Sequence, residues 1–150
     1  MPILAAWQGS NPLSYIDIII AGVLFSLIII QTISDEQQHK FQPLKYDKIH
    51  KGEKLSGNFK KGFIDYGLWK YSRHPNYTCE QLIWITFYFF SVSANGKLLN
   101  WSIIGCVLLV ILFYFSAKFS ESISTKKYPE YNNYQNNTPM FIGFKQKNHE

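Results

Sequence analysis

A polar cluster in the middle of the chain combines side chains that could bind a charged organic ligand. The stretch GLWKYSRHPNYTCEQLIW, residues 67–84, contains Arg73, His74, Asn76 and Glu80 and then continues into an apolar segment. Arg73 carries a rigid fork of N–H donors that suits phosphate groups. The amide of Asn76 offers a donor and an acceptor, so it can pair with a carboxamide or an exocyclic amine. These residue types together indicate a ligand site.

A simpler interpretation of the same stretch is a belt that anchors the chain at a membrane interface. Aromatic rings and long cationic side chains are typical of that position. The candidate anchors are Trp69, Lys70, Tyr71, Arg73 and Tyr77. The residue types alone leave both interpretations open, although a carboxylate such as Glu80 inside the apolar segment has to face the protein interior.

Two more polar groups lie where other apolar segments end. Gln31, Asp35, Gln38 and Gln42 recur at helical spacing, which predicts one polar stripe. The stripe could face a shared cavity, or it could be the solvated end of a helix. Farther along the chain, Lys118 and Glu121 are three residues apart. They could contribute to the same cavity or form an interfacial salt bridge.

Three apolar blocks must position these groups. They cover residues 13–33, 81–94 and 101–117, and the first is long enough to cross a bilayer core as a helix. The turn signal Asn-Gly-Lys at residues 95–97 makes the second and third blocks a helical hairpin. We therefore expect an all-α integral membrane protein with three transmembrane helices, at about residues 13–42, 76–94 and 101–127.

The distribution of cations predicts the orientation of these helices. Segment 35–78 holds eight Lys and one Arg, and the tail after residue 117 holds five Lys. The turn 95–100 holds one Lys, and the first dozen residues hold none. Cationic loops favour the cytosolic side. We expect the N-terminus outside, with the basic loop and the tail on the inner face, in the endoplasmic reticulum of a eukaryote or the plasma membrane of a bacterium.

The remaining composition argues against other classes of site. The formal net charge of +5 is explained by the cationic loops, so we expect no nucleic-acid partner. The cysteines, Cys79 and Cys106, adjoin apolar blocks and lack the spacing of metal ligands. We therefore expect neither a disulfide nor a metal site.

The motifs resemble those of a known family. The run GLWKYSRHPNYTCE, preceded by SDEQQHKF and followed by Glu121 and YPEYNNYQNNTPMFIGF, is similar to the C-terminal half of steroid 5α-reductase-like membrane proteins. The resemblance covers residues 16–144 and includes the broad uncharacterised branch of that family. The shorter His-Pro-x-Tyr core is shared, more distantly, with isoprenylcysteine carboxyl methyltransferases.

The resemblance implies NADPH as the cofactor, bound from the cytosolic side. It implies reduction of a carbon–carbon double bond in a steroid- or lipid-like substrate, with hydride supplied by the nicotinamide. The positions that match the cofactor motif are Asp35, Arg73, His74, Asn76, Tyr77, Glu80 and Glu121. The resemblance assigns no catalytic acid to this chain.

The resemblance also implies that the chain, residues 1–150, is one membrane domain equivalent to half of a longer architecture. Members of the family carry additional helices upstream, so a missing N-terminal half or a partner chain would supply much of the substrate pocket. The expected partners are the lipid bilayer and a lipid-like small molecule. Two alternatives stay open: an S-adenosylmethionine-dependent methyltransferase of the isoprenylcysteine type, and a truncated membrane protein without catalytic activity.

Overall fold

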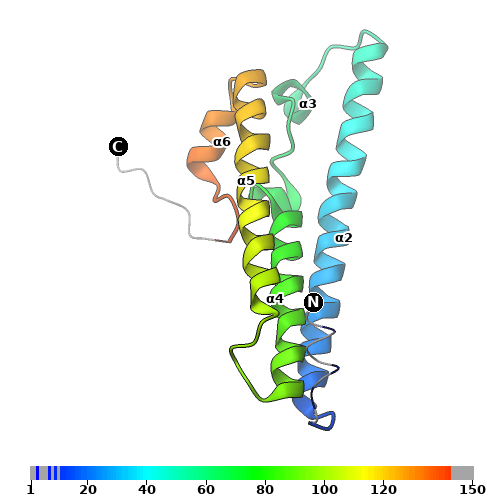
Figure 1. The fold of residues 1–150 in the computed structure, drawn as a ribbon. Coiled ribbons are helices and arrows are strands. Elements are labelled where there is room, and N and C mark those ends of the chain that lie inside the picture. Colours follow the sequence, from blue (N-terminus) through cyan, green and yellow to red (C-terminus); the bar gives the residue numbers. More distant parts are fainter. Residues whose placement is uncertain (1–2, 4–6, 8, 10, 143–150) are drawn as a thin grey trace. The chain divides into compact units, whose positions relative to one another are not determined.

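The described part of the chain is built from helices. A computed structural model describes residues 3, 7, 9 and 11–142. Its elements are α2 (Tyr15–His50), α3 (Gly57–Lys61), the 3-10 helix η1 (Gly67–Lys70), α4 (Pro75–Asn95), α5 (Ile103–Lys127) and α6 (Tyr131–Asn137) (Figure 1). These residues contain no strand, which confirms the all-α prediction.

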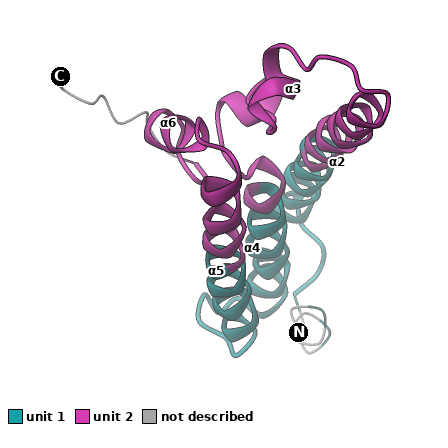
Figure 2. Cartoon of the chain, turned by 90° about the horizontal axis from the view of Figure 1, so that it is seen from above, with its two compact units in different colours: residues 1–30, 79–115 teal, residues 31–78, 116–150 magenta. Residues whose placement is uncertain are grey.

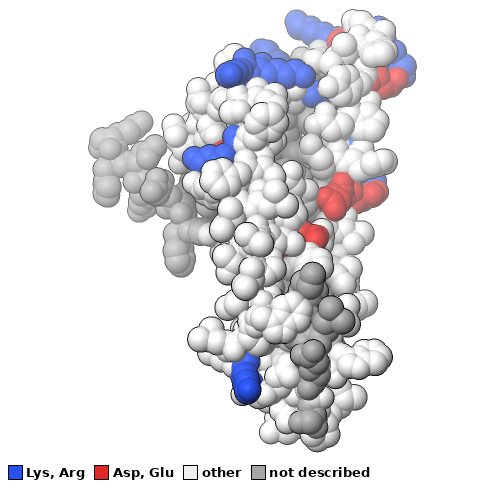
Figure 3. All heavy atoms as spheres, in the orientation of Figure 1, with Lys and Arg blue, Asp and Glu red and all other residues white. Residues whose placement is uncertain are grey.

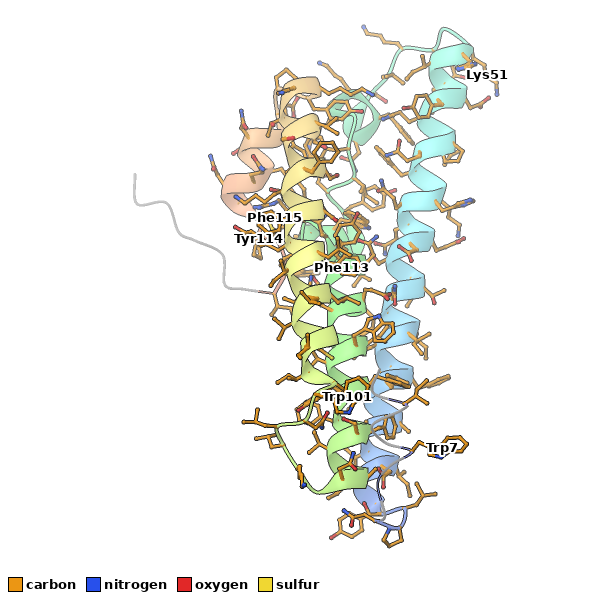
Figure 4. The ribbon with its side chains drawn as sticks, viewed as in Figure 1. Trp7, Lys51, Trp101, Phe113, Tyr114 and Phe115 are labelled. Atoms are coloured by element: carbon orange, nitrogen blue, oxygen red, sulfur yellow. The ribbon has the colours of Figure 1, made fainter. Side chains whose placement is uncertain are left out.

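Two helices are long and apolar enough to cross a membrane. They are α2 and α5, with mean hydropathies of 2.4 and 2.2 over their most apolar stretches. Only 6% and 11% of these stretches are buried, whereas the core helix of a soluble protein is mostly buried. Phe113, Tyr114 and Phe115 illustrate how apolar side chains surround α5 (Figure 4). The two helices suggest a membrane protein, while a third crossing by α4 and the orientation remain predictions.

The first long helix extends farther than the sequence indicates. The prediction ended it at residue 42, before Pro43, but α2 continues through the proline to His50. Proline removes one helical hydrogen bond and normally kinks or ends a helix. Here tertiary contacts hold the helix on both sides of it. Phe41 stacks on Phe59 with ring centroids 5.3 Å apart, and Lys45 is buried beyond the proline.

The chain divides into two compact units, which Figure 2 colours separately. Unit 1 covers residues 1–30 and 79–115, and its described part holds the first part of α2, most of α4 and the first half of α5. The connection between these helices is closed by polar contacts. The hydroxyls of Ser91 and Ser102 lie 3.1 Å apart, and Asn100 Oδ1 accepts a hydrogen bond from the Ser102 amide at 3.1 Å. These contacts form the predicted helical hairpin.

Unit 2 covers residues 31–78 and 116–150. Its core cluster is Phe41, Ile64 and Trp69, and the indole of Trp69 donates to the carbonyl of Ser34 at 3.2 Å. The chain after α6 folds back onto the segment before α4. There the amide of Arg73 donates to the carbonyl of Pro139 at 2.9 Å, and the amide of His74 donates to that of Met140 at 3.1 Å. Unit 2 therefore combines the ends of α2 and α5 with the polar cluster and the tail.

Candidate functional site

Unit 2 contains a cavity of about 380 Å³, within the roughly 300–1,000 Å³ typical of ligand pockets. Side chains from α2, the loop before α4, the start of α4, α5 and the tail line it. They are Gln38, Gln42, Tyr46, Gly62, Phe63, Ile64, Trp69, Arg73, His74, Asn76, Tyr77, Ser120, Ile123, Ser124, Lys127, Tyr128, Tyr131 and Tyr134. This lining includes two cations and no carboxylate, so the cavity favours neutral or anionic groups.

An ion-pair cluster fixes one wall of the cavity. Arg73 donates two hydrogen bonds to the carboxylate of Glu121, from Nε at 2.6 Å and from Nη2 at 3.2 Å. The ring of His74 contacts the same carboxylate, with Nε2 3.1 Å from Oε1. Glu121 is only 3% exposed, so its charge depends on these partners. The cluster joins α5 to the segment just before α4.

The same arginine also holds the tail. Its Nη1 donates to the carbonyls of Gln135 and Thr138 at 2.7 and 2.6 Å. The side-chain amide of Gln135 donates in turn to Glu121 at 2.8 Å. Four of the five N–H groups of Arg73 are thus engaged within unit 2. The main role of Arg73 at the cavity is therefore to hold its wall in place. One N–H group of Arg73 takes no part in these contacts.

The carboxyl of Glu121 makes the stability of unit 2 depend on pH. Burial raises its pKa, but hydrogen bonds from His74 and Arg73 and the arginine charge outweigh that and lower it to about 2. In the unfolded chain the pKa of a glutamate is about 4.3, so the carboxyl loses its proton more readily in the folded protein. The ionised carboxylate therefore stabilises the fold above about pH 4.3, and this contribution is lost as pH falls toward 2. We expect the tail to loosen across that window, and amide hydrogen exchange at Arg73 and His74 measures it. If their protection is constant from pH 5 to pH 2.5, the expectation is wrong.

Two buried amide oxygens beside the cavity lack hydrogen-bond partners. They are Oε1 of Gln38, on α2, and Oδ1 of Asn76, on α4. A buried polar atom without a partner costs about 1–3 kcal/mol, so native structures rarely keep one without reason. Both atoms are acceptors, and a ligand with N–H groups would satisfy them. These two oxygens are therefore the atoms of unit 2 best placed to accept hydrogen bonds from a ligand.

Aromatic rings form another wall. Phe63 packs edge to face on Tyr131 and parallel to Tyr134, with ring centroids 5.0 and 5.2 Å away. The hydroxyl of Tyr134 donates to the carbonyl of Trp69. Burial raises the pKa of both tyrosines, so they are neutral at physiological pH. The face of an aromatic ring suits a planar heterocycle.

The structure brings four of the seven predicted site residues to the cavity: Arg73, His74, Asn76 and Tyr77. Glu121 does not line it but binds two that do. Asp35 is exposed on α2 and is not part of the lining. Glu80 belongs to unit 1, where it accepts a hydrogen bond from the indole of Trp84 at 2.9 Å. None of the three acidic positions lines the cavity. Glu121 supports it through Arg73 and His74, whereas Asp35 and Glu80 lie outside its lining.

Several lining residues were not among the predicted site residues. Gln38 lies in the predicted polar stripe, three residues after Asp35, and it is the stripe member with the unpaired oxygen. Tyr128 begins the run YPEYNNYQNNTPMFIGF and Lys127 precedes it, but neither was among the positions matched to the cofactor motif. Only the folding of the tail and of the loop before α4 brings them to the cavity. Figure 3 shows cations of unit 2 gathered over the ends of α2 and α5 and over α3.

Comparisons with known proteins found one matching family and a curated relative. Residues 1–138 match the family described as Protein of unknown function (DUF1295). An uncharacterized protein of Schizosaccharomyces pombe is 33% identical over 130 residues, which are 77% of this chain and 36% of that protein. The chain thus spans about a third of the length of this curated relative. No solved structure matches.

Proposed function

The chain belongs to the DUF1295 family, a steroid 5α-reductase-like family, and from this premise we propose that it binds NADPH in the cavity of unit 2. The proposed activity is reduction of a carbon–carbon double bond in a steroid- or lipid-like substrate. The observation that carries the proposal is the pair of unpaired amide oxygens of Gln38 and Asn76 in a cavity without carboxylates. NADPH supplies hydride chemistry when bound.

The chemistry of the cavity fits parts of this cofactor. The carboxamide of a nicotinamide and the exocyclic amine of an adenine both present N–H donors to acceptors such as Gln38 Oε1 and Asn76 Oδ1. The rings of Phe63, Tyr131 and Tyr134 offer a surface for a planar base. Arg73 and His74 hold the wall in place through Glu121, so the contact atoms are positioned before binding. In this proposal, hydrogen bonds to Asn76 and Gln38 orient the bound cofactor.

The proposed substrate, a steroid- or lipid-like molecule, is inferred from the family alone. The chain covers 36% of its relative, and the additional helices of a longer architecture would complete a substrate pocket. In this proposal, such helices, in the same chain or in a partner chain, would contribute to reduction of the substrate. The binding of NADPH to this chain is the part that unit 2 can support by itself.

Replacing Asn76 with leucine tests the contact directly. Leucine has a similar volume but cannot accept the hydrogen bond, so we expect NADPH affinity to fall about tenfold, as for one lost hydrogen bond of about 1.4 kcal/mol. Binding is measured by isothermal titration on detergent-solubilised protein. Asn136→Leu is the matched control, because Asn136 is exposed on α6 and does not line the cavity. Equal affinities for the two variants would contradict the role of Asn76.

Titration of the unaltered protein with NADPH and with S-adenosylmethionine separates the proposed function from its alternatives. Both ligands carry an adenine amine, so the unpaired oxygens alone do not distinguish them. Binding of NADPH without S-adenosylmethionine supports the reductase. Binding of S-adenosylmethionine alone replaces it with the methyltransferase, and binding of neither supports a membrane protein without catalytic activity.

A further inference from the structure

A buried lysine lies behind the cavity without an acidic partner. Lys45 is 4% exposed, and its Nζ donates to the Gly62 carbonyl at 2.9 Å and to the Tyr128 hydroxyl at 3.1 Å. The rings of Phe41, Tyr46 and Tyr128 surround the ammonium at 5.0–5.9 Å. No carboxylate among the described residues forms an ion pair with it. Buried charges are usually paired, so an anion bound in this corner would be stabilised by Lys45.

The adjoining face of α5 carries hydrogen-bond donors into the cavity. Ser120, Ser124 and Lys127 are spaced at i, i+4 and i+7, so they share one face of the helix, and all three line the cavity. Tyr128 follows directly and lines it as well. Because the Tyr128 oxygen accepts from Lys45, its own hydroxyl proton is available to another acceptor. Hydroxyls and an ammonium on one face are the donors that phosphate oxygens require.

The electrostatics of this corner favour negative charge. Burial raises the pKa of the Tyr128 hydroxyl, but the hydrogen bond and charge of Lys45, together with those of Lys127, outweigh burial and lower it. The hydrogen bond with Tyr128 likewise raises the pKa of Lys127. The Tyr128 oxygen therefore interacts with two lysines, and their positive charge is what lowers the pKa of its hydroxyl. An anion placed in the cavity beside that oxygen would be stabilised by the same two lysines.

We propose that Ser124, Lys127 and Tyr128, backed by Lys45, form a binding site for the phosphate groups of a soluble nucleotide. The identity of that nucleotide as NADPH rests on the proposed function. The proposal orients the ligand, with phosphates toward the end of α5 and the amide-bearing part toward Gln38 and Asn76. It also discriminates between cofactors, because S-adenosylmethionine has no phosphate and carries a cationic sulfonium.

The test compares two charge reversals at neighbouring positions. Lys127→Glu places a carboxylate on the cavity wall, and Lys126→Glu makes the same change one residue earlier, outside the lining. Both lie in the last turn of α5, so effects on the helix dipole and net charge are shared. Isothermal titration with NADPH and with inorganic pyrophosphate is performed in a neutral detergent. We expect Lys127→Glu to weaken both ligands about tenfold or more relative to Lys126→Glu.

The outcomes separate this site from the proposed function. If NADPH binds and the two variants have equal affinity for it and for pyrophosphate, the phosphate site is overturned while the cofactor proposal stands. If NADPH does not bind but pyrophosphate does, with the expected difference between variants, the phosphate site stands and the cofactor is wrong. Binding is also compared in phosphatidylcholine nanodiscs with and without phosphatidylglycerol. If only the anionic lipid distinguishes the variants, the site binds lipid headgroups and the nucleotide assignment is overturned.

Discussion

Replacing Glu121 with alanine is expected to destabilise unit 2 by about 3–5 kcal/mol. The substitution leaves Arg73 buried among the carbonyls of Gln135 and Thr138 without its counter-charge, and it removes the acceptor that His74 contacts. An unpaired buried charge accounts for most of the expected loss. The tail should detach first, because Glu121 connects it to α5 both directly, through Gln135, and by way of Arg73. Amide hydrogen exchange measures this as lost protection at Arg73 and His74, whose amides donate to the tail.

Glu130→Ala is the matched control for this prediction. Glu130 is exposed at the start of α6 and makes no side-chain capping hydrogen bond, so its loss should change stability by no more than about 0.5 kcal/mol. The double variant Arg73→Met with Glu121→Leu should recover part of the loss, because it leaves no buried charge unpaired. Equal protection in Glu121→Ala and Glu130→Ala would show that the ion-pair cluster does not hold the tail.

The helical class was predictable from the sequence because apolar blocks leave little choice of secondary structure. Helices cover the three apolar blocks apart from residues 13–14 and 101–102, and the Asn-Gly turn signal lies at the end of α4. The end of α2 was not predictable in this way. Pro43 argues locally for a stop, and only the stacking of Phe41 on Phe59 and the burial of Lys45 reveal why the helix continues. Such contacts join residues far apart in the sequence.

In the candidate site too, some features were predictable from the sequence and others depend on tertiary contacts. Residue chemistry identified Arg73, His74 and Asn76, which lie next to each other in one motif. It could not reveal that Glu121 forms an ion pair with Arg73, since the two residues are 48 positions apart in the sequence. It also did not select Lys45, or Tyr128 at the start of the run YPEYNNYQNNTPMFIGF, because their roles depend on the fold of the loop between α2 and α4. Motifs therefore locate the wall of the cavity, and tertiary contacts decide which of their atoms remain available to a ligand.

The second large effect is expected from Gly62→Ala, which should destabilise unit 2 by about 2–5 kcal/mol. Gly62 ends α3 in a left-handed conformation, with φ of 87°, where a Cβ costs roughly 1–2 kcal/mol. The added methyl group would also overlap the ring of Tyr128, and overpacking costs about 1–3 kcal/mol more. The ring cannot simply move away, because Lys45 holds both the Tyr128 hydroxyl and the Gly62 carbonyl. Chemical unfolding in detergent measures the change.

Gly52→Ala separates the two causes. Gly52 is also left-handed, with φ of 67°, but a Cβ there would meet no atom within 4 Å, so only the backbone cost applies. The excess loss in Gly62→Ala is therefore a measure of how firmly Tyr128 is fixed. A fixed ring keeps its hydroxyl in the cavity and lets a phosphate bind without first ordering that side chain. Equal losses in the two variants would mean that Tyr128 yields to the methyl group, and a preorganised phosphate site at the end of α5 would then lose its structural basis.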